Sequence, residues 1–240
     1  MRFKIRVEAP DNPLLAEFLT STLTNFSRVE QLVRVYERET KETRGRRNSA
    51  HLDILRSAVV FIHATLEDGM RVATRMGLPR NNREVIDKIP LVGLNQSGNA
   101  EKFFLGRLTE HMDKTVKQLI DESIDNYLER ISYTSTAELA GWLKVLEVDV
   151  NLVQSLFPTL DLMMKRRHHI VHRGDRSVKT GPGQQFARSL SAQVVRQWNE
   201  AVGVFLGHIL EAIMSKLDWP EQVSGLTLRS SGTPQKRGAP

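Results

Sequence analysis

Apolar side chains recur every three or four residues along four long stretches of this chain, and this spacing constrains the fold more than any other feature. The stretches span residues 11–39, 51–76, 115–131 and 189–216. On a helix such residues line one face, which must be buried against another element. The alternation of apolar and charged residues that is typical of a strand is clear only at Met1–Val7. We therefore predict an all-α protein built as a helical bundle.

Start and stop signals place the ends of several helices. Asn12-Pro13 is typical of a helix start. Thr134-Ser135-Thr136 offers a cap for a short helix, with Glu138 in its first turn. Gly174 is expected to stop a later helix that Pro158 interrupts. These shorter helices are expected at residues 83–88, 137–146 and 152–172.

The same pattern divides the chain of 240 residues into three parts. We expect an N-terminal helical extension at residues 1–49, a helical domain at 50–220 and a basic, flexible tail at 221–240. The short strand at Met1–Val7 would need a partner edge, which a dimer could supply. The alternative is that this segment is a flexible arm.

Composition narrows the class of protein. Forty per cent of the residues are apolar, which is enough for a sizeable core, and no apolar run has the length of a membrane span. The N-terminus lacks the apolar block of a signal peptide. The absence of cysteine excludes disulfides and thiolate metal sites and is compatible with a reducing cytosol, so we predict a cytoplasmic protein that does not bind membranes. The net charge of +6 favours anionic partners.

Residues 165–175 carry the strongest functional signal. This segment holds three of the seven histidines of the chain, beside a lysine and three arginines. Arginine offers a planar, permanently charged fork to phosphate oxygens, and histidine exchanges protons near neutral pH. The segment therefore suits a phosphate ester as substrate. A structural alternative is that its cations stabilise the C-terminal end of a helix.

The spacing inside this segment is that of a known signature. Arg167-His168-x-x-x-His172 is an Arg-polar-x-x-x-His pattern, and Arg-Gly-Asp follows it at 173–175. It resembles the signature of the HEPN superfamily of helical ribonucleases. An earlier apolar helix that carries Glu67-Asp68 and a final amphipathic helix agree with that family. The resemblance covers about residues 50–217 and is greatest to the RiboL-PSP type, a group linked with stress and phage-defence operons.

The resemblance implies a metal-independent endoribonuclease that acts as a homodimer and uses no cofactor. Arg167 would hold the scissile phosphate, and His172 would move protons, so that RNA is left with 2′,3′-cyclic phosphate ends. His168 would orient Arg167 or touch the phosphate. Glu67, with Asp68 as the alternative, would pair with that arginine or orient His172. The chain would then be a toxin or an antiviral defence effector with an antitoxin or defence-system partner.

Four cations beside the motif are candidates for contacts with the RNA backbone: Arg166, Arg173, Arg176 and Lys179. Aromatic platforms for base stacking are scarce, so we expect little sequence-specific reading of the RNA. His63 lies one turn before Glu67 and is expected to be a partly buried structural histidine.

The same residues allow other interpretations. Arg167 lies about 140° from His172 on a helical wheel, so the pair needs a distorted helix end or a wide cleft between two subunits. His168 and His172 also have the spacing of two zinc ligands on a helix, although no glutamate base follows His168. Two further alternatives are a non-catalytic module that binds RNA, nucleotide or a partner protein, and a helical adaptor whose basic patch binds an acidic protein.

Overall fold

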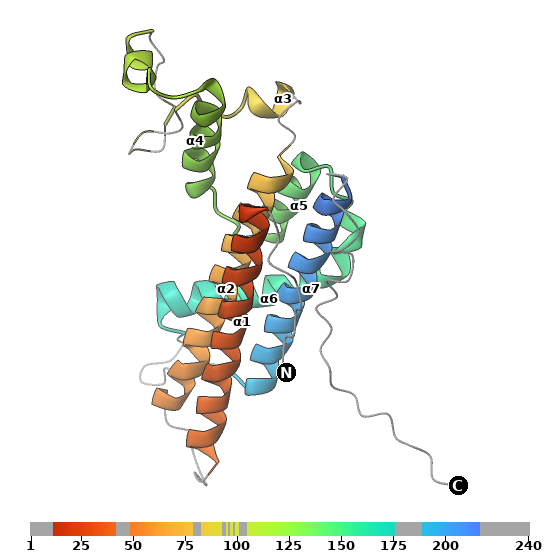
Figure 1. Cartoon of the computed structure of the whole chain (residues 1–240). Coiled ribbons are helices and arrows are strands. Elements are labelled where there is room, and N and C mark those ends of the chain that lie inside the picture. Colours follow the sequence, from red (N-terminus) through yellow and green to blue (C-terminus); the bar gives the residue numbers. More distant parts are fainter. Residues whose placement is uncertain are drawn as a thin grey trace, which may run out of the picture.

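In a computed structural model the chain is an all-α protein, as the apolar spacing predicts (Figure 1). The structure describes residues 12–41, 49–78, 83–92, 95, 97, 99–100, 105–175 and 189–216. Within these ranges no helix combines the length and the apolar character needed to cross a membrane. The predicted strand at Met1–Val7 and the predicted tail at 221–240 lie outside the described residues.

Three long helices and one that crosses them form the core. α1 (Pro13–Thr40), α2 (Ser49–Gly77) and α7 (Ala192–Lys216) lie alongside one another, and α6 (Phe157–Arg173) crosses them and packs on α2 and α7 (Figure 1). Their buried apolar side chains form one cluster. The shorter elements are α3 (Arg83–Ile86), α4 (Val116–Glu129), α5 (Thr136–Val145) and the 3₁₀ turns η1 (Leu105–His111), η2 (Val150–Leu152) and η3 (Gln154–Leu156).

α1 belongs to this core. Phe18, Phe26 and Val33 of α1 are buried in the same cluster as Leu55 of α2 and Phe205 of α7. The predicted domain boundary at residue 49 stays a prediction. The apolar face of α1 packs against α2 and α7, which belong to the predicted domain at residues 50–220.

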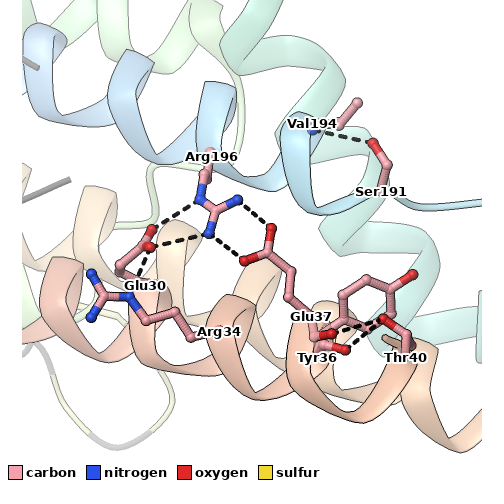
Figure 2. Close-up of polar contacts among 8 residues, drawn as sticks. All are labelled: Glu30, Arg34, Tyr36, Glu37, Thr40, Ser191, Val194 and Arg196. Atoms are coloured by element: carbon pink, nitrogen blue, oxygen red, sulfur yellow. Dashed lines mark hydrogen bonds and ion pairs between the residues drawn. The ribbon is translucent and has the colours of Figure 1, made fainter. Parts of the chain in front are cut away.

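Arg196 joins α1 to α7 through two carboxylates (Figure 2). Its guanidinium lies 3.1 Å from Glu30 and 2.6 Å from Glu37, and Glu30 also pairs with Arg34 at 3.2 Å. Hydrogen bonds from Arg196 lower the pKa of the Glu37 carboxyl, although partial burial of Glu37 opposes this shift. The two helices are therefore fixed by a surface network as well as by apolar packing.

The helix starts follow the predicted capping residues, with one exception. Asn12 Oδ1 accepts the N–H groups of the first turn of α1, and Ser135 with Glu138 forms a full capping box at α5. The prediction that Pro158 interrupts a helix beginning at residue 152 is wrong. Two 3₁₀ turns precede α6, and Pro158 stands in its first turn, where the missing N–H removes no helical hydrogen bond.

α4 meets the core at the C-terminal end of α2, and Figure 1 shows α3 and α4 at one end of the molecule, beyond the long helices. Ile124 and Leu128 pack with Leu78 in a second, smaller apolar cluster. Arg75 of α2 pairs with Asp125 of α4 at 2.6 Å. The segment that follows α4 also lies against α2, where Tyr133 contacts Thr74.

Candidate functional site

The motif histidines lie in the last turns of α6, and Gly174 ends that helix as predicted. Gly174 has φ 57°, a left-handed conformation that glycine adopts without a steric penalty. The next residue, Asp175, also has a positive φ of 58°, and its N–H donates to the carbonyl of His169 at 3.0 Å. The turn directs the Asp175 side chain toward α2 and α6, where it is buried.

Asp175 is completely buried and pairs with two arginines. Its Oδ2 lies 3.0 Å from Nε of Arg56 on α2 and 2.7 Å from Nη2 of Arg166 on α6. Arg166 also donates to the carbonyl of Ser189 at 3.3 Å. A buried carboxylate is tolerated when cations and hydrogen bonds compensate its charge. The Arg-Gly-Asp end of the motif thus attaches α6 to α2 and to the segment before α7.

A stripe of polar side chains runs along the otherwise apolar buried face of α2. Arg56, His63, Glu67 and Thr74 are separated by seven, four and seven residues, which places them within about 20° of one direction on a helical wheel. Each contacts or faces a polar group of another part of the chain or of the stripe itself. We call these four residues the α2 polar stripe, and they mark where α6 and the segment after α4 meet α2.

Glu67 is the centre of this stripe. Its Oε2 lies 3.3 Å from Nδ1 of His63, without the alignment of a full hydrogen bond, so we treat the contact as electrostatic. The pKa of the Glu67 carboxyl is lowered, and His63 makes the largest contribution to this shift. Desolvation raises the pKa and so opposes the shift, whereas the charge of Arg167 and the backbone N–H of Tyr133 add to the lowering. Glu67 is therefore a carboxylate at neutral pH, and Arg167 is the predicted site residue whose positive charge contributes to its lowered pKa.

Tyr133, in the segment between α4 and α5, closes the other side of this region. Its ring is fully buried, and its hydroxyl lies 3.2 Å from the hydroxyl of Thr74. Burial raises the pKa of this phenol to about 12, so it stays protonated in the physiological range. Tyr133 is thus an uncharged, buried side chain next to the surroundings of Glu67.

His168 and His172 lie on another side of α6. Both side chains are exposed, and their ring centroids are 4.7 Å apart. Arg167 is half-buried, and its Nε is buried and lacks a hydrogen-bond partner in the described part of the chain. The arginine and the histidine of the predicted catalytic pair therefore face different surroundings within this chain, as their wheel angle predicts.

The structure separates the four predicted RNA-binding cations. Arg173 is exposed beside His172, whereas the guanidinium of Arg166 faces buried Asp175. Arg176 and Lys179 lie outside the described residues. Asp68, the alternative to Glu67, is half-buried, and no shared contact links it to the motif helix among the residues described.

Metal binding through the two motif histidines finds no added support. Among the described residues, no group of three or more histidine, cysteine, aspartate or glutamate side chains is arranged to hold a metal ion. The imidazoles of His168 and His172, which are tilted by 42° relative to each other, would need a third ligand from elsewhere.

Sequence reasoning missed the contact between Arg56 and Asp175 and the contact of His63 with Glu67. A usable signal was present in α2, because charged and polar residues recur there at positions that an apolar stripe should occupy. A polar residue on a buried face requires a partner. For Asp175, the signal was its place directly after the helix-stopping glycine.

Comparisons of the chain with protein-family models, with curated proteins and with solved structures found no match. The resemblance to HEPN ribonucleases therefore stays a prediction made from residues 167–175 and their sequence context.

Proposed function

We propose that this chain is a metal-independent endoribonuclease of the HEPN type, which acts in the cytoplasm as a homodimer. The observation that carries the proposal is the pair of exposed imidazoles, His168 and His172, whose rings lie 4.7 Å apart at the arginine-rich end of α6. Two neighbouring imidazoles can supply both a base and an acid near neutral pH. Arg167 and Arg173 supply the positive charge that an RNA phosphate requires.

The chemistry needs no metal and no water in its first step. His172 accepts the proton of a ribose 2′-hydroxyl, and the 2′-oxygen attacks the adjacent phosphorus. The bond from phosphorus to the 5′-oxygen breaks, and His168 donates a proton to that leaving oxygen. Arg167 stabilises the negative charge that grows on the phosphate oxygens. The products are a 2′,3′-cyclic phosphate and a 5′-hydroxyl.

A dimer completes this site because Arg167 and His172 face different surroundings in one subunit. A two-fold axis beside the end of α6 would bring Arg167 of one subunit toward His172 of the other. Val171, next to His172 on α6, is a large apolar side chain that is 49% exposed, and a second copy of the helix at this end would cover it.

RNA cleavage by the purified protein in EDTA tests the proposal. We expect the wild type to cleave single-stranded RNA, and His172→Ala and Arg167→Ala to lose at least about a hundredfold in rate, as removal of a general base or an electrostatic stabiliser does. His208→Ala is the matched control, because His208 is an exposed histidine on α7. Equal cleavage by wild type and His172→Ala would exclude this mechanism, and activity lost in EDTA would point to a metal at His168 and His172.

Mixing the two inactive variants tests the shared site. In a heterodimer of Arg167→Ala and His172→Ala subunits, one of the two composite sites keeps both groups. Random exchange of subunits should therefore restore about a quarter of wild-type activity. No recovery after demonstrated subunit exchange would show that each subunit carries its own complete site.

The alternative is a non-catalytic module, and the separation of Arg167 from His172 in one subunit is the observation that favours it. A folded dimer that binds RNA but cleaves none would select this alternative. The toxin or defence role, with an antitoxin or defence-system partner, rests on the resemblance. Growth arrest on expression of the wild type, but not of His172→Ala, would support it.

A further inference from the structure

α4 carries an apolar stripe that is only half covered. Val116, Ile120 and Ile124 recur every four residues and so lie on one side of the helix. Ile124 is 2% exposed because it packs with Leu78 in the second apolar cluster, whereas Ile120 and Val116 are 38% and 75% exposed. Met112, four residues before Val116, is 82% exposed. We call Met112, Val116 and Ile120 the α4 apolar patch, and exposed apolar side chains gathered in this way mark a contact with another segment or molecule.

The part of the chain that carries this patch is acidic. Residues 105–129 hold six aspartates and glutamates against three lysines and arginines, although the whole chain has a net charge of +6. Asp125 pairs with Arg75 of α2, which still leaves an excess of carboxylates. Such a surface is a poor partner for a second copy of itself, since like charges would then face each other. It favours an occupant that combines apolar side chains with positive charge.

Met1–Val7 has this matching chemistry. Its apolar residues alternate with Arg2, Lys4 and Arg6, so an extended segment presents one apolar side. The long basic side chains can bend toward carboxylates beside an apolar surface. An extended segment of this kind commonly pairs with the edge of a sheet, but the described part of the chain contains no strand. A helix face is therefore the kind of apolar surface that it can meet among the described residues of its own chain.

The segment begins close enough to reach the patch. α1 and α2 are antiparallel, so the start of α1 lies at the C-terminal end of α2, where α4 is attached (Figure 1). Eleven residues precede Asn12 and can span at most about 36–40 Å. α4 has 14 residues and is therefore only about 21 Å long. No second copy is needed to bring the segment to the patch.

We propose that residues 1–7 dock on the α4 apolar patch of the same chain, with their apolar side chains against Val116 and Ile120 and their cations toward the carboxylates of α4. The inference goes beyond the proposed ribonuclease function and does not depend on it. It assigns an occupant to the uncovered half of α4 and does not involve the end of α6.

Thiol reactivity tests whether the segment covers the patch, because the chain contains no cysteine of its own. The rate of alkylation is measured for Val116→Cys, alone and combined with Phe3→Ser and Ile5→Ser. We expect the two serines to raise the rate at least about fivefold, since they remove the apolar contacts that cover the thiol. Leu162→Cys is the matched control, because Leu162 is 62% exposed on α6, and its rate should not change. Equal rates at position 116 would overturn the inference, whether both are slow because another segment covers the thiol or both are fast because nothing does.

Cross-linking with a short bis-maleimide tests which copy supplies the segment. Glu8→Cys is combined with Lys117→Cys, beside the patch, or with the control Lys165→Cys on α6; both lysines are exposed. We expect a product of monomer mass to form at least about tenfold faster for the pair 8 and 117, because docking raises the effective concentration of the two thiols. The rate should fall at about 1 M salt, which screens the charges. A product of twice the monomer mass, equal rates for the two pairs, or a rate independent of salt would each overturn the inference.

Discussion

Asp175 and Glu30 are both acidic residues held by two arginines, yet they differ in their access to water. Asp175 is 0% exposed, and its partners Arg56 and Arg166 are 11% and 12% exposed. Glu30 is 11% exposed, but its partners Arg34 and Arg196 are 61% and 34% exposed. Water can replace a lost partner around Glu30 far more easily than around Asp175.

The difference bears on what each network does. A buried ion pair contributes little net stability compared with apolar packing, but removal of one partner leaves an uncompensated charge. Exposed pairs are worth little, and their loss costs little. The Asp175 network thus fixes the geometry of the motif end, where α6 must keep one position against α2. The Glu30 network in Figure 2 adds modest strength to the contact between α1 and α7.

The largest effect is expected for Asp175→Ala. It leaves Arg56 and Arg166 without their shared buried carboxylate, so we expect the free energy of unfolding to fall by about 3–5 kcal/mol. Urea unfolding of the wild type and the variant gives this value. Asp53→Ala is the control, because Asp53 pairs with the same Arg56 at 2.6 Å but is 67% exposed. A loss above about 1 kcal/mol for Asp53→Ala would contradict the role assigned to burial.

Arg196→Ala should have a smaller effect. It removes the guanidinium that joins Glu30 and Glu37, and we expect a loss of about 1–2 kcal/mol because several charge-assisted hydrogen bonds disappear at a partly exposed site. A double-mutant cycle with Glu37→Ala measures the coupling. If Arg196→Ala were as costly as Asp175→Ala, access to water would not be what distinguishes the two networks.

Gly174→Ala tests the turn that aims Asp175 inward. With φ at 57°, a Cβ is strained there, and we expect a loss of about 1 kcal/mol. Gly141→Ala, on α5, is a suitable control because a Cβ would meet nothing within 4 Å. Since alanine favours a helix, the control should be neutral or slightly stabilising. An equal loss in both variants would mean that the left-handed turn is not the cause.

The helices could be predicted from sequence because their apolar spacing and capping residues are local. The geometry of the candidate site was harder to predict from the sequence, as the neighbours Arg166 and Arg167 illustrate. They are identical in type and lie about 100° apart on α6, so composition cannot tell which one pairs with Asp175 and which one only contributes its charge to the surroundings of Glu67. That choice depends on how α6 lies against α2.

Asp175 shows the same limit at the end of the motif. Its position after Gly174 is visible in the sequence, but its burial follows from two successive left-handed residues and from Arg56, which is 119 positions away in the chain. His63 was predicted to be a partly buried structural histidine, and the structure buries it almost completely, at 1% exposed. Its contact with Glu67 was within reach, since the two residues are one helical turn apart.

The smallest effect on stability is expected for Glu67→Gln, and this effect on the free energy of unfolding should depend on pH. The folded-state pKa of Glu67 lies below its ordinary value of 4.5, so its charged form stabilises the fold. This contribution is present above the unfolded pKa and is lost as pH falls through the folded pKa. The difference in unfolding free energy between wild type and Glu67→Gln, measured in urea from pH 7 to 3, should stay below about 1 kcal/mol because the carboxylate is partly screened by water. It should be constant above pH 5 and shrink below about 4.5. A difference that persists or grows at pH 3 would mean that Glu67 stabilises the fold through packing rather than through its charge. In that case its exposure to water would not explain its effect on stability, as it does for Asp175 and Glu30.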